Sequence, residues 1–396
     1  HAARPNILFI MSDDHAYQAI TAYGSNRNET PNIDRIASEG IRFDRCYVTN
    51  SICAPSRATI LTGKYSHLNG VPDNYTEFDG SQPTFPKLLQ AVGYQTALIG
   101  KWHLHSEPTG FDHWDILPGQ GKYYRPDFIS PAGRRDEPGH ATEVTTRLAL
   151  KWLESQRDVD KPFLLMVQHK APHRRWDPAV EQVVAFANRE FLEPETLMDD
   201  YATRRTAAHH AEMRIEQMNP TSDLKLWAPD DRTRQWLYGH MGDAERRVWQ
   251  THVDPRIGIH SGLEAPPAER RRAWYQLYMR DYLACIASID EGVGQLLDYL
   301  DMAGLTEDTL VVYTSDQGFY LGEHGWFDKR FMYEESFQMP FLTRYPKEIP
   351  AGSVCDNIAC NVDFAPTFLD FAQLTTPSYM QGRSIRALLN GNTPDD

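Results

Sequence analysis

The sequence predicts an α/β fold, with a mostly parallel sheet sandwiched between helices. Two observations support this fold class. Strand-length apolar runs alternate along the chain with amphipathic helical patterns, and no apolar run reaches the roughly 18 residues that a membrane span needs. The chain of 396 residues is long enough for one large domain or for two or three small ones.

Five segments have the length and composition of buried strands. The first, residues 6–11, is a continuous apolar run, as expected for a strand that is covered on both faces. The other four are residues 96–100, 163–168, 309–314 and 340–343. Because helical segments separate most of them, we expect these strands to run largely parallel.

Three segments show helical periodicity. Residues 31–40 place Ile33 and Ile36 on one face. Residues 143–156 form a second amphipathic pattern, and the longest runs from about residue 267 to residue 303. These segments are predicted to cover the two faces of the sheet.

The stretch from about residue 177 to residue 266 is different. It is rich in Arg, Trp, His and acidic residues, and its helical pattern is weak. We expect it to be a long insertion across the top of the sheet, serving either as solvated decoration or in substrate recognition. Its aromatic residues Trp227, Trp236 and Trp249 could stack on a ligand or belong to the core.

Composition excludes several classes of protein. Lys and Arg total 40 and Asp and Glu total 54, so the formal net charge is −14, which argues against non-specific nucleic-acid binding. Five cysteines are too few for a disulfide-stapled fold, and no pair has the CxxC spacing of a zinc site. Cys355 and Cys360 could form a bridge or remain buried free thiols.

Polar side chains follow four of the predicted strands at the point where each strand ends. They are Ser12 to His15 after the first strand, Lys101 to His103 after the second, His169 to His173 after the third and Ser315 to Gly318 after the fourth. In open parallel sheets, ligands bind beyond the carboxyl ends of the strands. One such group could simply cap a helix, but four together predict a functional site.

The acidic members of this set predict a cation site. Asp13, Asp14, Asp316 and the amide oxygen of Gln317 offer only oxygen ligands, which suits Ca²⁺ or Mg²⁺ better than zinc. Without a cation, three clustered carboxylates would repel one another and raise their own pKa values.

A second constellation begins at Cys53. Pro55 suits the first turn of a helix and Gly63 suits its end, so Cys53 is expected at a helix N-terminus, where free N–H groups favour an anion. Arg57 follows four residues later and therefore faces the same side. A lone cysteine is usually a small buried hydrophobe, but these neighbours argue against that interpretation.

These motifs resemble the type I sulfatases, from about residue 4 to the C-terminus. The matching segments are Cys53-x-Pro55-Ser56-Arg57 with Leu61-Thr62-Gly63, the opening strand with Ser12-Asp13-Asp14, and Gly100-Lys101-Trp102-His103. The resemblance implies an alkaline-phosphatase-like α/β core. It also implies that a formylglycine-generating maturation enzyme oxidises Cys53 to formylglycine.

The same resemblance assigns roles to individual residues. Ca²⁺ would be held by Asp13, Asp14, Asp316, Gln317 and the modified residue 53. Most relatives have Asn where this chain has Gln317, whose amide oxygen lies on a longer arm. Arg57 would steady the formylglycine hydrate, and the sulfate and leaving oxygen would contact Lys101, His103, His173 and Lys329. For His169, a substrate contact and a purely structural hydrogen bond both remain open.

A mechanism follows from these implied roles. One hydroxyl of the hydrated aldehyde would attack sulfur, with Asp316 as the base. His173, with Lys329 or Lys101, would protonate the departing alkoxide, and His103 would take the proton of the second hydroxyl as sulfate leaves.

Two further segments narrow the range of candidate substrates. Residues 168–173 and 316–330 are similar to bacterial carbohydrate sulfatases, especially those that remove 6-O-sulfate from N-acetylglucosamine. This similarity implies a sulfated glycan as substrate and a periplasmic, cell-surface or secreted location, with a signal peptide already removed. Relatives usually continue into a small C-terminal subdomain, so we expect residues 1–396 to form the catalytic domain with that subdomain missing or truncated.

Other functions stay open at this point. A phosphonate monoester or phosphodiester hydrolase could use the same formylglycine and cation. A catalytically silent glycan-binding protein could retain the scaffold, although it should have lost at least one key residue. A metal-stabilised α/β protein with Cys53 in its core is the third alternative.

Overall fold

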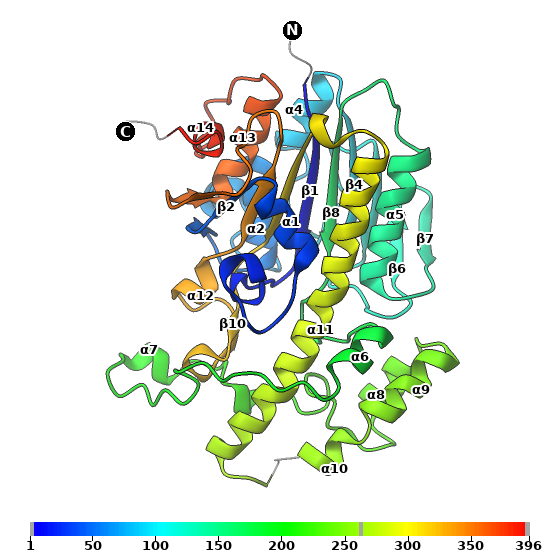
Figure 1. Ribbon diagram of the computed structural model, residues 1–396, viewed down its shortest axis with the longest axis vertical. Helices are drawn as coiled ribbons and strands as arrows, with labels where there is room; N and C mark the ends of the chain where they lie inside the picture. Colours follow the sequence, from blue (N-terminus) through cyan, green and yellow to red (C-terminus); the bar gives the residue numbers. More distant parts are fainter. Residues whose placement is uncertain (1–3, 261–263, 393–396) are drawn as a thin grey trace.

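The computed structural model describes residues 4–260 and 264–392. Ten of the strands in this part of the chain form one sheet: β1 (Asn6–Ser12), β2 (Ile41–Phe43), β4 (Gln95–Lys101), β5 (His113–Leu117), β6 (Asp127–Ser130), β7 (Gly133–Asp136), β8 (Phe163–His169), β9 (Thr309–Ser315), β12 (Phe341–Arg344) and β13 (Ser353–Cys355). Their order across the sheet is β13-β2-β12-β9-β1-β8-β4-β5-β6-β7. Figure 1 labels β2, β1, β8, β4, β6 and β7, which follow this order from left to right.

The centre of the sheet is parallel and its edges are mixed. Strands β9, β1, β8, β4 and β5 run parallel to one another, and they include the four segments predicted at 6–11, 96–100, 163–168 and 309–314. The segment predicted at 340–343 is β12, which is antiparallel to both β9 and β2. At the opposite edge, β6 and β7 are also antiparallel additions.

Helices cover both faces of the sheet, because alternate residues of the central strands point to opposite sides. Leu8 and Ile10 of β1 pack in one apolar cluster with α1 (Pro31–Ser38), α5 (Ala141–Ser155) and α11 (Pro267–Met302). Ile7 and Phe9 pack in the other cluster with α2 (Cys53–Thr62), α4 (Phe85–Ala91) and α13 (Phe364–Phe371). The predicted α/β sandwich and its helices at 31–40, 143–156 and 267–303 are therefore confirmed.

Helix α11 also fixes the start of α1. Thr30, which precedes α1, makes no side-chain cap. Instead Asp290, in the middle of α11, accepts hydrogen bonds from the backbone N–H groups of Asn32 at 3.0 Å and Ile33 at 2.8 Å. Since the first N–H groups of a helix lack internal partners, this carboxylate replaces a local cap and ties the two helices together.

The stretch at 177–266 contains short helices joined by irregular chain. They are α6 (Val180–Phe186), α7 (Thr206–His209), α8 (Arg232–Tyr238), α9 (Asp243–His252) and α10 (Arg256–His260). Figure 1 shows them beyond the carboxyl ends of β1 and β8, around the first half of α11. Within this stretch, Trp227 and Trp249 are buried and stack on each other with ring centroids 6.4 Å apart, whereas Trp236 is 44% exposed.

The remaining elements are short. They are β3 (Cys46–Tyr47), β10 (Tyr320–Leu321), β11 (Phe327–Asp328), β14 (Ala359–Cys360), α3 (Ser66–Asn69), α12 (Glu334–Phe337) and α14 (Arg386–Leu389). All five cysteines are free thiols, so Cys355 and Cys360 do not form a bridge. Among the described helices, none combines the length and apolar character that crossing a membrane requires.

Candidate active site

The register of the central strands brings their ends together. Ser12, the last residue of β1, lies opposite His169 of β8 on one side and Ser315 of β9 on the other. Asp13 and Asp316 follow directly, so they emerge side by side at the carboxyl edge of the sheet. This is the edge at which the strand-end residues were predicted to meet.

Lys101 reaches the same place because Gly100 lets β4 approach β8 closely. Gly100 has a φ of +112°, and a Cβ at this position would lie 1.9 Å from the carbonyl oxygen of Gln168. A side chain here would force the two strands apart. Gly100 therefore sets the place of Lys101, the last residue of β4.

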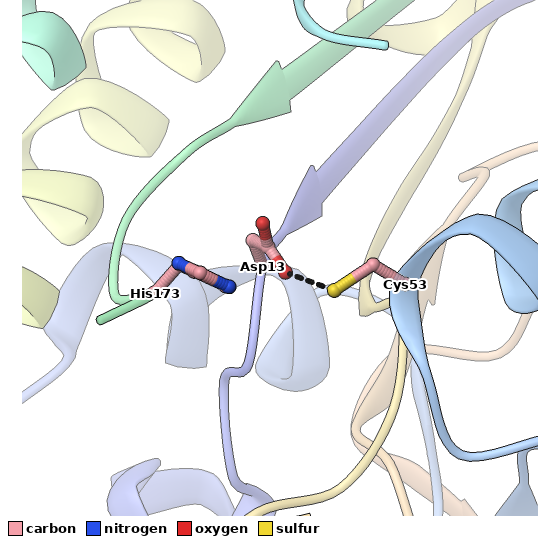
Figure 2. A group of neighbouring side chains, drawn as sticks. All are labelled: Asp13, Cys53 and His173. Atoms are coloured by element: carbon pink, nitrogen blue, oxygen red, sulfur yellow. Dashed lines mark hydrogen bonds between the residues drawn. The ribbon is translucent and has the colours of Figure 1, made fainter. Parts of the chain in front are cut away.

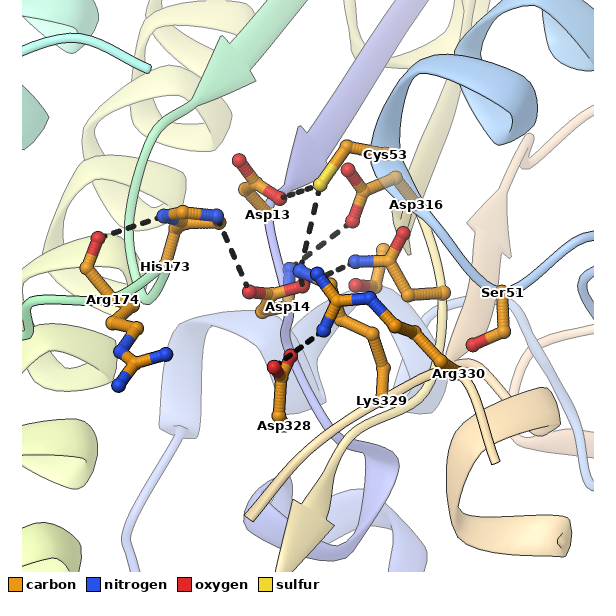
Figure 3. Close-up of polar contacts among 12 residues, drawn as sticks. Asp13, Asp14, Ser51, Cys53, His173, Arg174, Asp316, Asp328, Lys329 and Arg330 are labelled. Carbon is orange, nitrogen blue, oxygen red and sulfur yellow. Dashed lines mark hydrogen bonds and ion pairs between the residues drawn. The ribbon is translucent and has the colours of Figure 1, made fainter. Parts of the chain in front are cut away.

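Three carboxylates cluster at this edge. Oxygen atoms of Asp13, Asp14 and Asp316 lie within 4.8 Å of one another, and all three residues are fully buried (Figure 3). The backbone N–H of Asp14 donates to Asp316 Oδ1 at 3.1 Å. Asp14 itself has a φ of +68°, a left-handed conformation that Asp tolerates better than most residues.

These oxygens fit a hard divalent cation. Gln317 donates its amide N–H to Asp14 Oδ1, while its Oε1 is buried without a hydrogen-bond partner among the described residues. A buried carbonyl oxygen with no partner is costly, and a cation would satisfy it. Burial raises the pKa of Asp14 to about 6, with Lys329 opposing this shift and Asp316 adding to it, so a further positive charge would favour its ionised form.

Cys53 begins α2 and faces this cluster. Its Sγ donates to Asp13 Oδ1 at 3.3 Å (Figure 2). The same sulfur lies 3.5 Å from Lys329 Nζ and 3.9 Å from Lys101 Nζ. Burial raises the pKa of the thiol to about 12, although Lys329 opposes the shift. The unmodified thiol is therefore protonated at neutral pH and is a poor nucleophile.

Arg57 lies one turn further along α2, as its spacing predicts. Its Nε and Nη2 donate to Asp316 Oδ2 at 3.2 and 3.0 Å. Its Nη1 donates to the carbonyl oxygen of Lys101 at 2.7 Å and to Gln168 Oε1 at 2.6 Å. The pKa of Asp316 falls below its usual value because Arg57, with Lys101 and Lys329, outweighs the effect of burial.

Two lysines complete the charge pairs. Lys101 forms an ion pair with Asp13, and Lys329 forms one with Asp14. Burial lowers the pKa of Lys101 well below its usual value. The pKa of Lys329 is raised, because Asp14 and its other acidic neighbours outweigh burial. Both ammonium groups thus lie beside the sulfur of Cys53 while remaining tied to carboxylates.

Two histidines lie at the border of the cluster. His173 Nδ1 donates to the carbonyl oxygen of Arg174 at 2.7 Å, which leaves Nε2 facing Asp14 Oδ2 at 3.8 Å. His103 Nε2 accepts from the amide of Gln120 at 3.1 Å. Burial lowers the pKa of both imidazoles, that of His103 to about 2, so both rings are neutral in the free protein.

The sequence interpretation missed three residues. Gln120 links Lys101, whose Nζ donates to its Oε1 at 2.5 Å, with His103. Gln168 accepts from Arg57, and Lys170 lies just beyond the end of β8. Gln168 and Lys170 stood in the segment already singled out at residues 168–173, whereas Gln120 follows β5, a strand that was not predicted.

His169 is set apart from the other predicted site residues. It is fully buried, and within the described part of the chain neither of its ring nitrogens has a hydrogen-bond partner. Burial lowers its pKa to about 4. A substrate contact through His169 therefore stays a prediction.

A cavity of about 370 Å³ adjoins the cluster on the side of His173. Gln120 and His173 belong both to the contacts above and to the lining of this cavity. A bound molecule could therefore reach the cluster from it.

The family model described as Sulfatase matches residues 5–374. The N-acetylglucosamine-6-O-sulfatase of Bacteroides thetaiotaomicron is 50% identical over an alignment of 405 positions, which covers 99% of this chain and 72% of that protein. The chain belongs to the sulfatase family. It is accordingly a sulfuric ester hydrolase.

Two other relatives are named as sulfatases or bind a sulfated sugar, and a third match shares only the fold. A solved protein in complex with its substrate D-glucosamine-2-N,6-O-disulfate superimposes with a TM-score of 0.97 at 50% identity, covering all of this chain and 82% of that one. The human N-acetylglucosamine-6-sulfatase is 26% identical, over 98% of this chain and 65% of its own length. The phosphonate monoester hydrolase of Agrobacterium radiobacter, with a TM-score of 0.72 and 20% identity, covers 99% of this chain and 78% of its own and shares the fold.

Proposed function

We propose that this sulfatase removes the 6-O-sulfate of N-acetylglucosamine in a sulfated glycan, with residue 53 in the formylglycine form. The proposal rests mainly on the position of Cys53 at the start of α2. Its Sγ lies 3.3 Å from Asp13 Oδ1 and 3.5 Å from Lys329 Nζ. The choice of sugar is supported by the 50% identity to a protein named as an N-acetylglucosamine-6-O-sulfatase.

The proposal includes Ca²⁺ as the cofactor. Its ligands would be Asp13, Asp14, Asp316, the free Oε1 of Gln317 and residue 53. When bound, the cation would neutralise sulfate oxygens and lower the pKa of a hydroxyl on residue 53. Arg57 holds Asp316 in place for this role.

The chemistry of residue 53 explains why the thiol has to be changed. Hydration of the aldehyde supplies one hydroxyl that can attack sulfur and a second whose deprotonation ejects sulfate and restores the aldehyde. Asp316 takes the proton of the attacking hydroxyl. His173 Nε2 protonates the departing sugar oxygen, with Lys329 or Lys101 nearby, and His103 accepts the proton of the second hydroxyl.

The histidines can serve as proton carriers only with an anion in place. Both are neutral in the free protein because burial lowers their pKa values. A bound sulfate ester brings negative charge beside them and stabilises an imidazolium. Lys101 and Lys329 flank residue 53 and would hold the sulfate oxygens.

Two features around the catalytic domain belong to the same proposal. Residues 1–396 would form one sulfatase domain, and the insertion at 177–266 would help to recognise the sugar, since Ser222, Asp223 and Trp236 line the cavity beside His173.

A formylglycine-generating enzyme would be a partner during maturation. Because sulfated glycans lie outside the cytosol, we propose a periplasmic, cell-surface or secreted location.

A substrate panel tests the proposal. Protein whose residue 53 has been shown by mass spectrometry to be an aldehyde should hydrolyse N-acetylglucosamine-6-O-sulfate with a higher kcat/KM than its 3-O-sulfate, galactose-6-O-sulfate, an aryl sulfate or an aryl phosphonate. Faster cleavage of the phosphonate would favour the phosphonate hydrolase. Binding without turnover of any ester, despite a confirmed aldehyde, would favour a silent glycan-binding protein.

A further inference from the structure

The cavity beside His173 is built from three parts of the chain. Its walls come from the loop after β5, the segment after β8 and the insertion. The polar and charged residues that line it include Gln120, Lys122, Lys170, Arg174, Arg175 and Asp177. The partly exposed Trp236 also lines it, with the guanidinium of Arg175 4.5 Å from its ring centroid.

Positive charge is in excess in this cavity, although the chain as a whole has a net charge of −14. Four of its lining residues are Lys or Arg, and two, Asp177 and Asp223, are carboxylates. Asp223 accepts from Arg174 at 2.8 Å, and Asp177 lies 3.9 Å from Arg175. Lys122 pairs with Asp127 at 2.9 Å, so the uncompensated positive charge of the cavity lies on Lys170, which favours an anionic ligand despite the net negative charge of the chain.

Lys170 differs from the other cations that line the cavity in its lack of a carboxylate partner among the described residues. It is 4% exposed, yet within the described part of the chain its ammonium has no hydrogen bond and no carboxylate within 4.0 Å. The ammonium lies over the ring of Tyr123, with Nζ 4.4 Å from the centroid. Burial lowers its pKa to about 8, although Asp177 opposes the shift. An ammonium that lines a cavity without a carboxylate partner favours a ligand that supplies the missing negative charge.

The position of the cavity fits the sugar side of the reaction. His173, which is proposed to protonate the departing sugar oxygen, lines the cavity and also lies 3.8 Å from Asp14. Gln120 lines it too and bonds to Lys101. A sugar whose ester oxygen is next to His173 would thus extend toward Lys170, which is three residues away in the chain.

We propose that this cavity is a subsite for a second anionic group of the sulfated glycan, and that Lys170 pairs with that group, an assignment that rests on the proposed function above. The shared chemistry is a sulfo or carboxylate oxygen. It could come from an N-sulfo group on the same glucosamine or from the carboxylate of a neighbouring uronic acid. Lys170 is thereby a specificity residue that contacts substrate.

The test compares substrates that differ in this second charge. The probes are N-acetylglucosamine-6-O-sulfate, D-glucosamine-2-N,6-O-disulfate, and a disaccharide that joins the first sugar to a uronic acid. Wild-type protein should show a higher kcat/KM for at least one doubly charged probe than for the singly charged one. The preferred probe identifies the source of the charge.

Lys170→Met should remove that preference. A charge-assisted hydrogen bond in a buried site corresponds to about a tenfold or larger effect on kcat/KM for the doubly charged probe, with much less change for the singly charged one. Lys170→Arg keeps the positive charge and should retain part of the preference. The matched control is Lys161→Met, because Lys161 is an exposed lysine just before β8, at the other end of the same strand.

Each outcome decides the matter. If both doubly charged probes react no better than N-acetylglucosamine-6-O-sulfate in the wild type, the subsite is wrong, whether or not Lys170→Met folds. An unchanged preference in a folded Lys170→Met protein also contradicts it. Failure of every 6-O-sulfated probe, with the aldehyde confirmed and another ester cleaved, would instead refute the proposed function.

Discussion

The catalytic cluster and the cavity beside it handle buried charge in opposite ways. In the cluster each buried cation has a carboxylate: Arg57 bonds to Asp316, Lys101 to Asp13 and Lys329 to Asp14. In the cavity, Lys170 is almost as deeply buried and has no such partner in the described chain. The two regions share His173 and Gln120 as a border.

This difference indicates a division of labour. Paired charges keep the cluster in one arrangement before substrate arrives, so little reorganisation is needed during the reaction. An unpaired charge gains its partner only on binding, and it therefore favours a ligand that brings an anion to that point. Catalysis and selection of the sugar would then depend on neighbouring but separable residues.

The largest effect is expected when a charge pair in the cluster is broken. Arg57→Ala leaves Asp316 without its bonded guanidinium, so the free energy of unfolding should fall by about 3–5 kcal/mol. Turnover should fall by about 10²–10³-fold, because Asp316 and the main chain of Lys101 lose their positioning. Thermal unfolding and sulfate release measure the two effects.

A matched arginine provides the control for that variant. Arg147 on α5 pairs with Glu137 at 3.2 Å but is 54% exposed. Arg147→Ala should lower stability by less than about 1 kcal/mol and leave turnover unchanged. Equal losses in the two variants would show that the pairing in the cluster has no special role.

Removal of divalent cations should have the next largest effect. Asp13, Asp14, Asp316 and the free Oε1 of Gln317 are left as a cluster of oxygens without a central charge. A cation present at about 100 times its Kd stabilises the folded state by about 2.7 kcal/mol, so a chelator should lower the Tm and stop turnover. Added Ca²⁺ should restore both.

The Asp316→Asn variant makes the chelator experiment specific. Since it lacks one of the three negative charges that would hold the cation, its Tm should respond to the chelator much less than that of the wild type. Wild-type protein that keeps its Tm and its turnover in chelator would contradict the cation site. Recovery with Mg²⁺ but not Ca²⁺ would change the assigned metal.

A smaller effect is expected at the border between the two regions. Gln120 accepts from Lys101 at 2.5 Å and donates to His103 at 3.1 Å, so Gln120→Ala frees both side chains. We expect kcat to fall by about tenfold, as for the loss of one or two hydrogen bonds, with a smaller change in KM. Gln90→Ala, which removes a bond to Asp112 near the start of β4, should leave kcat unchanged.

The smallest effect is expected at Asp290, a buried carboxyl group that accepts hydrogen bonds from backbone N–H groups. Burial raises the pKa of Asp290 to about 6, against 3.8 for a free carboxyl, although the N–H groups of Asn32 and Ile33 oppose the shift. The folded protein thus binds this proton more tightly than the unfolded chain. The stability linked to this proton is complete below about pH 4 and is lost as the pH rises through 6.

Asp290→Asn measures this loss. The stability of the wild type relative to the variant should fall by about 1–2 kcal/mol between pH 4 and pH 7, as followed by denaturant unfolding. A constant or opposite difference would mean that the hydrogen bonds from α1 outweigh burial.

The central sheet could be predicted because its strands are long and apolar on both faces. Residues 6–11 and 163–168 carry that signal within themselves. The edge strands do not: β2 is three residues long and gains its place by pairing with β12, some 300 residues later in the chain. Such pairing depends on the whole fold and leaves no mark in a short segment.

The same distinction applies to the site. Cys53 and Arg57 lie one turn apart on one helix, and Asp13 and Asp14 follow one strand, so spacing was enough to single them out. Gln120 has no such context, because its strand β5 was not predicted. The unpaired state of Lys170 is a property of its surroundings in three dimensions and could not be read from residues 168–173.

Residue 53 is proposed to react as an aldehyde beside the carboxylate cluster. The direct test is to prepare the protein with different fractions of residue 53 converted, to determine each fraction by peptide mass, and to measure the initial rate of sulfate release from N-acetylglucosamine-6-O-sulfate. The rate should rise in proportion to the converted fraction and be absent in Cys53→Ala. A rate that is independent of that fraction, or full activity in Cys53→Ala, would contradict the account.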